Sequence, residues 1–223
     1  MAKANRVLTP VARLLAFQPL NVKTEFDNKT KKFIVSPAGS TVGRYNATFL
    51  IPMTEDVTAI QAAMKEAARD CNPNVEFKHF QHKFRKGNAL IEKALKKNPE
   101  KNADRMSYYK DMWVLEAKSV HLPDLSKAVN GKPTEVANEM VSREFYSGCF
   151  VKAEINFSAT EVDDGEDENG DARFKRYVTA YHNFVIKVKD GERLGRKSRE
   201  EVFKGALGGT SDKPIEVDDD VEF

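Results

Sequence analysis

The sequence predicts a mainly β protein, because its longest patterned segments alternate apolar and polar residues with the period of two of a strand. Two such runs, residues 146–157 and 175–188, flank a strongly acidic loop of residues 161–171. We expect them to pair as a hairpin with one face on the core. The apolar face of the first run comprises Cys149, Val151, Ala153, Ile155 and Phe157, and that of the second comprises Val178, Ala180, Phe184, Ile186 and Val188.

The opposite face of these runs mixes rings with cations. It carries Tyr146, Phe150 and Lys152 from the first run, and Lys175, Tyr177, Thr179, Tyr181, Asn183 and Lys187 from the second. Exposed rings gain nothing in water, whereas rings interleaved with cations suit single-stranded nucleic acid, which offers stackable bases and a negative backbone. Tyrosines on a sheet face can equally pack beneath a loop or against a second subunit. The pattern alone leaves both interpretations open.

The composition limits the protein class. A chain of 223 residues can form one large domain or two small ones. No apolar run approaches the ~18 residues of a membrane span, so we expect a soluble intracellular protein. Cys71 and Cys149 lack CxxC spacing and are expected to be buried hydrophobes. His79 and His82 near Cys71 fall short of the about four ligands of a zinc site, and we expect no metal or other cofactor.

The formal net charge of +2 conceals a segregation of charge along the chain. Residues 212–223 carry six acids and one lysine, which leaves +7 on residues 1–211. The loop at 161–171 adds seven acids and no base, so the rest of the body stands at +14. A basic body with acidic appendages indicates a polyanionic partner and a tethered competitor for it.

The N-terminal quarter is expected to contain strands. Residues 5–20 predict a strand with a bend at Pro10, which lacks a ladder donor. Residues 21–42 are turn-rich, with a short strand at 32–36. Residues 43–52 alternate well up to Pro52 and predict a strand with one apolar side, formed by Tyr45, Ala47, Phe49 and Ile51.

A helix is expected at about residues 55–70. Thr54 can cap it, and Glu55 and Asp56 suit its first turn. An apolar stripe recurs at helical spacing: Val57, Ile60, Met64, Ala67 and Ala68. This amphipathic helix must lie against the sheet, where its simplest role is to close one end of a barrel.

The segment from residue 72 to residue 110 is basic. A short helix at 88–97 is expected to stop before Pro99. The segment is either a solvated excursion or a mobile basic flap over a nucleic-acid groove. Its cations are Lys78, Lys83, Arg85, Lys86, Lys93, Lys96, Lys97, Lys101, Arg105 and Lys110.

The region that follows should begin with a strand and end in a connector. Residues 106–118 resume strand alternation, with Trp113, Leu115 and Ala117 on one side and Glu116 and Lys118 on the other. Trp113 is either a core residue or a stacking platform. Residues 119–145 are expected to be a turn-rich connector.

The sequence supports neither a calcium-binding loop nor a known catalytic motif. The acidic loop fails the EF-hand pattern in both registers, so we expect a solvated hairpin tip pointing away from any groove. The chain has no phosphate-binding glycine loop, HExxH or GxSxG, and an enzyme is therefore not expected. A metal-dependent nuclease using Asp163, Asp164 or Asp167 is the least favoured hypothesis.

Four stretches resemble a phage-encoded family of single-stranded DNA-binding proteins with an OB-type barrel: residues 7–13, 44–52, 146–153 and 188–195. That family is similar in plan to the replication single-stranded DNA-binding proteins of lytic phages, which end in an acidic tail with a terminal aromatic residue. The C-terminus resembles such a tail, with Asp218, Asp219, Asp220, Glu222 and Phe223. The acidic 161–171 insertion and the basic 78–110 segment depart from the family pattern.

The resemblance implies a mainly β, OB-fold-like barrel over residues 1–204 and a linker with an acidic tail, disordered, over residues 205–223. It implies a non-enzymatic protein in the cytoplasm of the host bacterial cell, which coats single-stranded DNA with little sequence specificity during replication, recombination or repair. The tail should recruit replication or recombination proteins and compete for the groove without DNA; a homodimer is one option. The expected DNA contacts are Trp113, Phe150, Lys152, Lys175, Arg176, Tyr177, Tyr181 and Lys187. The alternative is a β-barrel protein-interaction or virion assembly protein.

Overall fold

The structure is a computed structural model that describes residues 5–16, 18–30, 32–37, 39–97, 107–166 and 172–194. The N-terminal elements are β1 (Arg6–Leu8), β2 (Ala12–Leu15), β3 (Thr24–Asp27), β4 (Lys32–Val35), β5 (Tyr45–Pro52) and α1 (Thr58–Cys71). The central elements are η1 (Phe77–His79), β6 (Gln81–His82), β7 (Phe84–Lys86), α2 (Gly87–Lys97), η2 (Ser107–Tyr109) and β8 (Met112–Ser119). The C-terminal elements are β9 (Asp124–Val129), β10 (Lys132–Glu135), η3 (Asn138–Met140), α4 (Val141–Glu144), β11 (Phe150–Glu166) and β12 (Ala172–Lys189).

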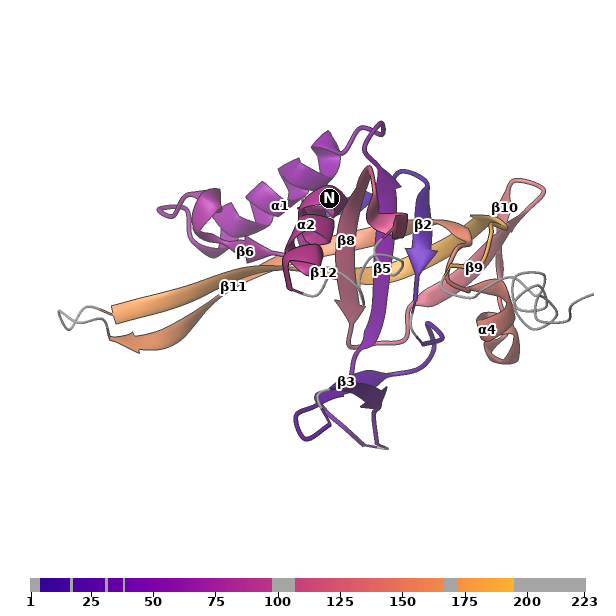
Figure 1. Cartoon of the computed structure of the whole chain (residues 1–223), viewed down its shortest axis with the longest axis horizontal. Helices are drawn as coiled ribbons and strands as arrows, with labels where there is room; N and C mark the ends of the chain where they lie inside the picture. The colour runs from indigo at the N-terminus through magenta and orange to yellow at the C-terminus, as the bar shows by residue number, and fades with distance from the viewer. Residues whose placement is uncertain are drawn as a thin grey trace, which may run out of the picture.

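The strands close into a ring that resembles a barrel (Figure 1). Strand β2 pairs with β5, β5 with β8, β8 with β12, β12 with β11, and β11 pairs back with β2. The β8–β12 pairing is parallel and the other pairings of the ring are antiparallel. This arrangement confirms the expected mainly β, OB-fold-like barrel.

The hairpin of β11 and β12 extends beyond the barrel (Figure 1). Its strands contain 17 and 18 residues, and their distal parts, residues 161–166 and 172–176, leave the ring and project as an arm (Figure 1). We call these residues the arm. The tip of the expected hairpin loop, residues 167–171, lies outside the described residues.

The predicted faces of this hairpin are correct in β11 and only partly correct in β12. The predicted inward residues of the first run, from Cys149 to Phe157, are all buried. In β12, Val178 and Ala180 are buried, but the predicted alternation fails after His182. There Val185 and Lys187 are buried, while Phe184 and Ile186 are half-exposed and Val188 is exposed.

A β-bulge explains this error. The register pairs Glu154 with Phe184 but Ile155 with His182, so Asn183 has no residue opposite it. One extra residue turns every later side chain of the strand to the other face. The assignments of Phe184, Ile186 and Val188 to the apolar face, and of Lys187 to the polar face, are therefore wrong.

Helix α1 shares one core with the interior of the barrel. Its buried residues, Ile60, Ala63, Met64, Ala67 and Ala68, belong to the same cluster as the inward residues of the barrel strands. The helix begins at Thr58 rather than near residue 55, and Thr54 does not cap it. Instead the carboxylate of Asp56 accepts a hydrogen bond of 2.8 Å from the backbone N–H of Thr58. None of the helices in the described part of the chain is long and apolar enough to cross a membrane.

Other expectations hold in outline. The expected strand at 5–20 is split into β1 and β2 around Pro10, the short strand at 32–36 is β4, and the helix at 88–97 is α2. The expected strand at 106–118 begins only at Met112.

The connector prediction for residues 119–145 is wrong, because this region contains the β9–β10 hairpin. Asn130 and Gly131 form its turn with positive φ values of 50° and 77°. An Asn-Gly pair is the usual signal for such a two-residue hairpin turn.

A second, smaller core lies on the outside of the barrel. Leu15, Leu50 and Val114 point outward from β2, β5 and β8 and are fully or almost fully buried. They are covered by Leu90 of α2, Tyr108, Tyr109, Met112 and Leu194. The backbone N–H of Leu194 also donates a 2.9 Å hydrogen bond to the carbonyl of Ser147. The last described residue is thus fixed on the outer face of the sheet.

His182 is a titratable group inside the main core. Its side chain is fully buried, its ring meets that of Phe49 edge-on with centroids 6.2 Å apart, and neither ring nitrogen has a hydrogen-bond partner among the described residues. Burial lowers the pKa of His182 from 6.5 to about 4. Because the pKa of His182 is lower in the folded state than in the unfolded state, the unfolded state takes up a proton first as the pH falls. The free energy of unfolding is therefore highest above pH 6.5 with respect to this group, and it decreases as the pH falls towards 4.

Replacing His182 with Leu should therefore flatten the acid side of the stability profile. We expect wild-type protein to lose roughly 2–3 kcal/mol more unfolding free energy between pH 7.5 and 4.5 than His182→Leu. Urea unfolding midpoints at a series of pH values measure the difference. His121→Leu, at an exposed position, is the matched control and should follow the wild type. Parallel profiles for wild type and His182→Leu would contradict the argument.

Candidate nucleic-acid interface

A groove of about 670 Å³ crosses the outer face of the barrel over β12, β8 and the end of β5. Its wall on one side is built by β6 and the chain leading into β7. We use the name groove for the surface that contains Asn46, Gln81, Lys83, Arg85, Glu116, Lys118, Thr160, Tyr177 and Tyr181. Its lining combines aromatic rings with several cations, which makes it the best candidate for a ligand site.

The strand register places ring, cation and amide in one row. Tyr181 of β12 lies opposite Lys118 of β8, and Lys118 lies opposite Asn46 of β5. Four residues back along β12, on the same face, Tyr177 lies opposite Gln81 of β6 and Thr160 of β11. At about 3.3 Å per residue, the two tyrosines are ~13 Å apart along the strand. Both rings are half-buried, so each keeps exposed surface.

The cations of the groove outnumber its carboxylate. Glu116 accepts a hydrogen bond from the Arg85 guanidinium, and the Lys83 ammonium lies 3.7 Å from its other oxygen. Lys118 has no described carboxylate within ion-pair distance. Burial lowers the pKa of Lys118, and the positive charges of Arg44 and Lys83 lower it further. Burial and the neighbouring cations thus disfavour the charged form of Lys118. An anion such as a phosphate would offset this repulsion, so the binding of an anion in the groove is favoured.

His82 borders the groove but does not form a metal site. Its ring stacks on Phe77 with centroids 5.5 Å apart and an interplanar angle of 11°. Burial lowers its pKa, and the charge of Arg85 lowers it further, against a backbone hydrogen bond with Phe84. Within the described ranges, Cys71, His79 and His82 do not gather into a group of metal ligands.

Two of the eight predicted DNA contacts, Tyr177 and Tyr181, lie in the groove. Trp113 instead packs at the edge of the core, stacked on Phe84 at 5.2 Å and 22°, with the Lys86 ammonium 5.7 Å from its ring centroid. The half-buried ring thus packs against the core, and the part of Trp113 in DNA binding stays a prediction.

The remaining predicted aromatic residue and its neighbour lie at the far end of the hairpin. Phe150 is flanked by the Lys189 ammonium at 4.6 Å and the Arg13 guanidinium at 5.9 Å from its centroid. Lys152 lies on the outer face of β11, opposite Ile186. Neither residue lines the groove, and their part in DNA binding stays a prediction.

The other predicted cations are already paired. On the arm, Lys175 bonds to Asp164 and Arg176 to Glu161. Lys187 is buried, with its ammonium 2.7 Å from Glu144 and 2.8 Å from Asp190. The five predicted tail residues, from Asp218 to Phe223, lie outside the described residues.

The predicted DNA contacts did not include the cations that the groove contains, although Lys83 and Arg85 were among the cations of the possible basic flap. Lys83 and Arg85 belong to the basic 72–110 segment, whose short strands β6 and β7 bring them against β12 and β8. The alternation of residues 112–118 placed Trp113 on one face of the strand and Lys118 on the other. This pattern could have identified Lys118 as an outward-facing cation. No local pattern could have shown that Lys118 meets Tyr181, because that contact depends on the parallel pairing of β8 with β12.

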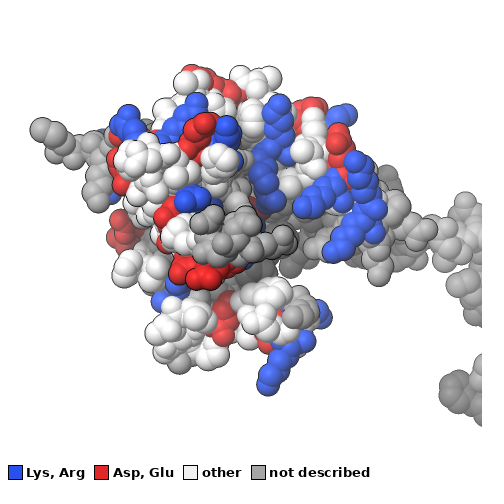
Figure 2. All heavy atoms as spheres, turned by 90° about the vertical axis from the view of Figure 1, so that its left-hand side faces the viewer, with Lys and Arg blue, Asp and Glu red and all other residues white. Residues whose placement is uncertain are grey.

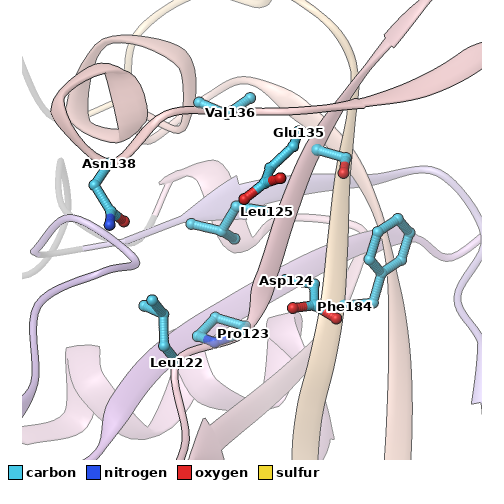
Figure 3. Close-up of a pocket in the computed structure, with 9 residues that line it drawn as sticks. Leu122, Pro123, Asp124, Leu125, Glu135, Val136, Asn138 and Phe184 are labelled. Carbon is cyan, nitrogen blue, oxygen red and sulfur yellow. The ribbon is translucent and has the colours of Figure 1, made fainter.

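A second hollow, of about 410 Å³, lies beyond Tyr181 on the same strand (Figure 3). Its walls include Leu122, Leu125 and the ring of Phe184, and the carboxylates of Asp124 and Glu135 stand beside them. Two carboxylates repel a phosphate backbone. A polyanion in the groove is therefore expected to cross from β12 over β8 to β5 rather than to continue along β12.

The comparisons with known proteins point to one family. The model of the family described as "Enterobacter phage Enc34, ssDNA-binding protein" matches residues 23–216. No curated protein matches the sequence.

Structures of the phage Enc34 protein share the fold of this chain. The single-stranded DNA-binding protein from bacteriophage Enc34 in complex with ssDNA is 18% identical, with a TM-score of 0.57, over 86% of this chain and 91% of that one. A C-terminal truncation of the Enc34 protein is similar, with 18% identity and a TM-score of 0.55, over 86% of this chain and 90% of that one. The gp2.5 single-stranded DNA-binding protein of bacteriophage T7 is 10% identical, with a TM-score of 0.38, over 98% of this chain and 97% of that one.

The electrostatics of the groove can be tested without a ligand. Lys83→Met removes a positive charge that lowers the pKa of Lys118, so the pKa of Lys118 should rise in this variant. The measurement is an NMR titration of the lysine side chains. Lys78→Met is the matched control, because Lys78 pairs with Glu76 away from the groove. Equal shifts in both variants would contradict the proposed coupling.

Proposed function

We propose, since the chain belongs to the Enc34 single-stranded DNA-binding protein family, that it binds single-stranded DNA through the groove. The observation that carries this proposal is the meeting of Tyr177 and Tyr181 with Lys83, Arg85 and Lys118 on one concave face. The family consists of DNA-binding proteins rather than enzymes, in agreement with the sequence-based expectation.

The groove suits a strand bound by its shape and charge rather than by its sequence. Bases of any kind stack on the two tyrosine rings, because every base has a π face. The phosphates are met by the groove cations, and Lys118 in particular has an unneutralised charge. We therefore propose that the protein coats single-stranded DNA with little sequence specificity, in phage replication, recombination or repair in the host cell.

Replacing both groove tyrosines with Ala should weaken binding without unfolding the protein. Both rings are half-buried on the outer face, and stacking is worth about 1–3 kcal/mol per base, so the double variant should lose at least tenfold in affinity. Gel shifts with single- and double-stranded oligonucleotides over a salt series provide the measurement. For the wild type, log affinity should fall steeply with log salt, because bound counterions are released.

Phe150→Ala is the informative comparison, because Phe150 is a predicted DNA contact that does not line the groove. If the groove carries most of the binding, Phe150→Ala should lose less affinity than the tyrosine double variant. Weak and salt-independent binding by the wild type would refute the proposed function. Loss of a stable oligomer in the tyrosine double variant, with DNA binding unchanged, would instead support a protein-interaction or virion assembly role.

The acidic C-terminal segment is proposed to compete with DNA for the groove and to recruit partner proteins once it is displaced. The position of Leu194 supports this. Leu194 packs on the outer cluster of Leu15, Leu50 and Val114, on the same sheet whose strand β8 carries Glu116 of the groove. The 29 residues that follow, 195–223, can span up to about 100 Å. We propose a division into a DNA-binding domain at 1–204 and a linker with tail at 205–223.

Deleting residues 212–223 should strengthen DNA binding, because it removes a competing net charge of −5. We expect roughly a three- to tenfold gain at low salt that disappears as salt screens the competition. Fluorescence anisotropy with a short oligonucleotide measures both. A full-length variant with Asp218, Asp219 and Asp220 changed to Asn should gain in the same direction. Unchanged or weaker binding by the truncated protein would refute competition by the tail.

A further inference from the structure

Two two-stranded elements project from the barrel (Figure 1), and each adjoins one end of the groove. One is the arm, which starts from the groove residues Thr160 and Tyr177. The other is the hairpin of β3 and β4, residues 24–35. The amide of Asn46 at the other end of the groove donates a 2.8 Å hydrogen bond to the Thr24 hydroxyl at the base of this hairpin. A strand of DNA that crosses the groove thus runs from one projection to the other.

Both projections expose apolar side chains. On the arm, Val162 is 51% and Phe174 42% exposed. On and beside the β3–β4 hairpin, Ile34 is 38%, Val35 58% and Val42 67% exposed. An isolated two-stranded ribbon is marginally stable in water, and clustered exposed apolar residues commonly mark an interaction surface. Each projection therefore has a surface that a protein partner could cover.

The two projections have opposite charge. The described part of the arm carries four acids and three bases, a net charge of −1. Its bases, Arg173, Lys175 and Arg176, are paired with Asp164 or Glu161, whereas Asp163 and Glu166 form no ion pair with a described residue. The β3–β4 hairpin presents Lys29 and Lys32 as exposed cations, joined by the half-exposed Lys23.

The acids of the hairpin are already engaged. The carboxylate of Asp27 accepts hydrogen bonds from Lys29 and Thr30, and that of Glu25 accepts one from the Ser40 hydroxyl. Figure 2, which faces the arm, shows acidic side chains beside it and basic ones projecting from the lowest part of the molecule, where Figure 1 places this hairpin.

We propose that the arm of one copy docks on the β3–β4 hairpin of a second copy of the same chain. The two surfaces differ, so the contact is head-to-tail and each added copy leaves one arm and one hairpin free for the next. Because the projections lie at opposite ends of the groove, such a row places successive grooves end to end. The alignment of the row with DNA rests on the proposed function; the contact between copies does not.

Charge reversal with rescue tests the contact in the full-length protein. One variant reverses the arm, Asp163→Lys with Glu166→Lys, and a second reverses the hairpin, Lys29→Glu with Lys32→Glu. Each alone should reduce neighbour association on long single-stranded DNA roughly tenfold, because like charges now meet. An equimolar mixture should restore it, since each reversed arm then meets a reversed hairpin. Mass photometry on long oligo(dT) counts the clusters.

A second measurement separates this contact from the groove. Binding to an oligonucleotide of about ten nucleotides, enough for one copy, should be unchanged in both variants. The control variant, Glu55→Lys with Glu139→Lys, removes two exposed acids elsewhere and should leave clustering unchanged. Clustering that survives either reversal, or that the mixture fails to restore, would overturn the proposal. If the wild type binds no DNA, sedimentation of the free protein at low salt tests the contact alone.

Discussion

The pairing of β11 with β12 is the interaction on which the rest of the structure depends. It closes the ring of strands, provides the sheet face that α1 covers, and continues outward as the arm. The bulge at Asn183 divides this hairpin into two parts with different functions. On one side of it, Tyr177 and Tyr181 face the groove and Val178 and Ala180 face the core. On the other, Val185 and Lys187 turn inward and Phe184 turns towards the acidic hollow.

The position of the bulge could not be predicted from the sequence. The alternation of β11, the strand at Tyr45–Pro52 and the two long helices were predictable, because each is a local pattern with a period of its own. The position of a single unpaired residue is not a local property, since it depends on which partner strand is matched residue by residue. The same limit affected the site: Tyr177 and Tyr181 were predicted, whereas Lys187 was assigned to the wrong face because Asn183 shifts it by one.

The groove cations were hidden for a related reason. Lys83 and Arg85 are distant from Lys118 along the chain. They meet Lys118 because β7 pairs with β8, and because β6 and β8 both pair with β12. A charge run in a sequence shows that positive charge is present but not where it gathers. Acidic residues then confine the groove. The carboxylates of Asp124 and Glu135 lie beyond Tyr181, and Glu116 pairs with Lys83 and Arg85. Lys118 has no counterion among the described residues.

The closure of the ring has a consequence for the order of folding. Strand β2 needs β11 as a partner, so the chain must bring Arg13 next to Phe150, and β8 needs β12, the last strand of the described chain. A nascent chain emerging from the ribosome can form α1 and the β5–β8 pair early, but it lacks the barrel until Lys189 is synthesised. Because the groove uses β12 as one of its sides, an incomplete chain cannot present Tyr177 and Tyr181 beside Lys118.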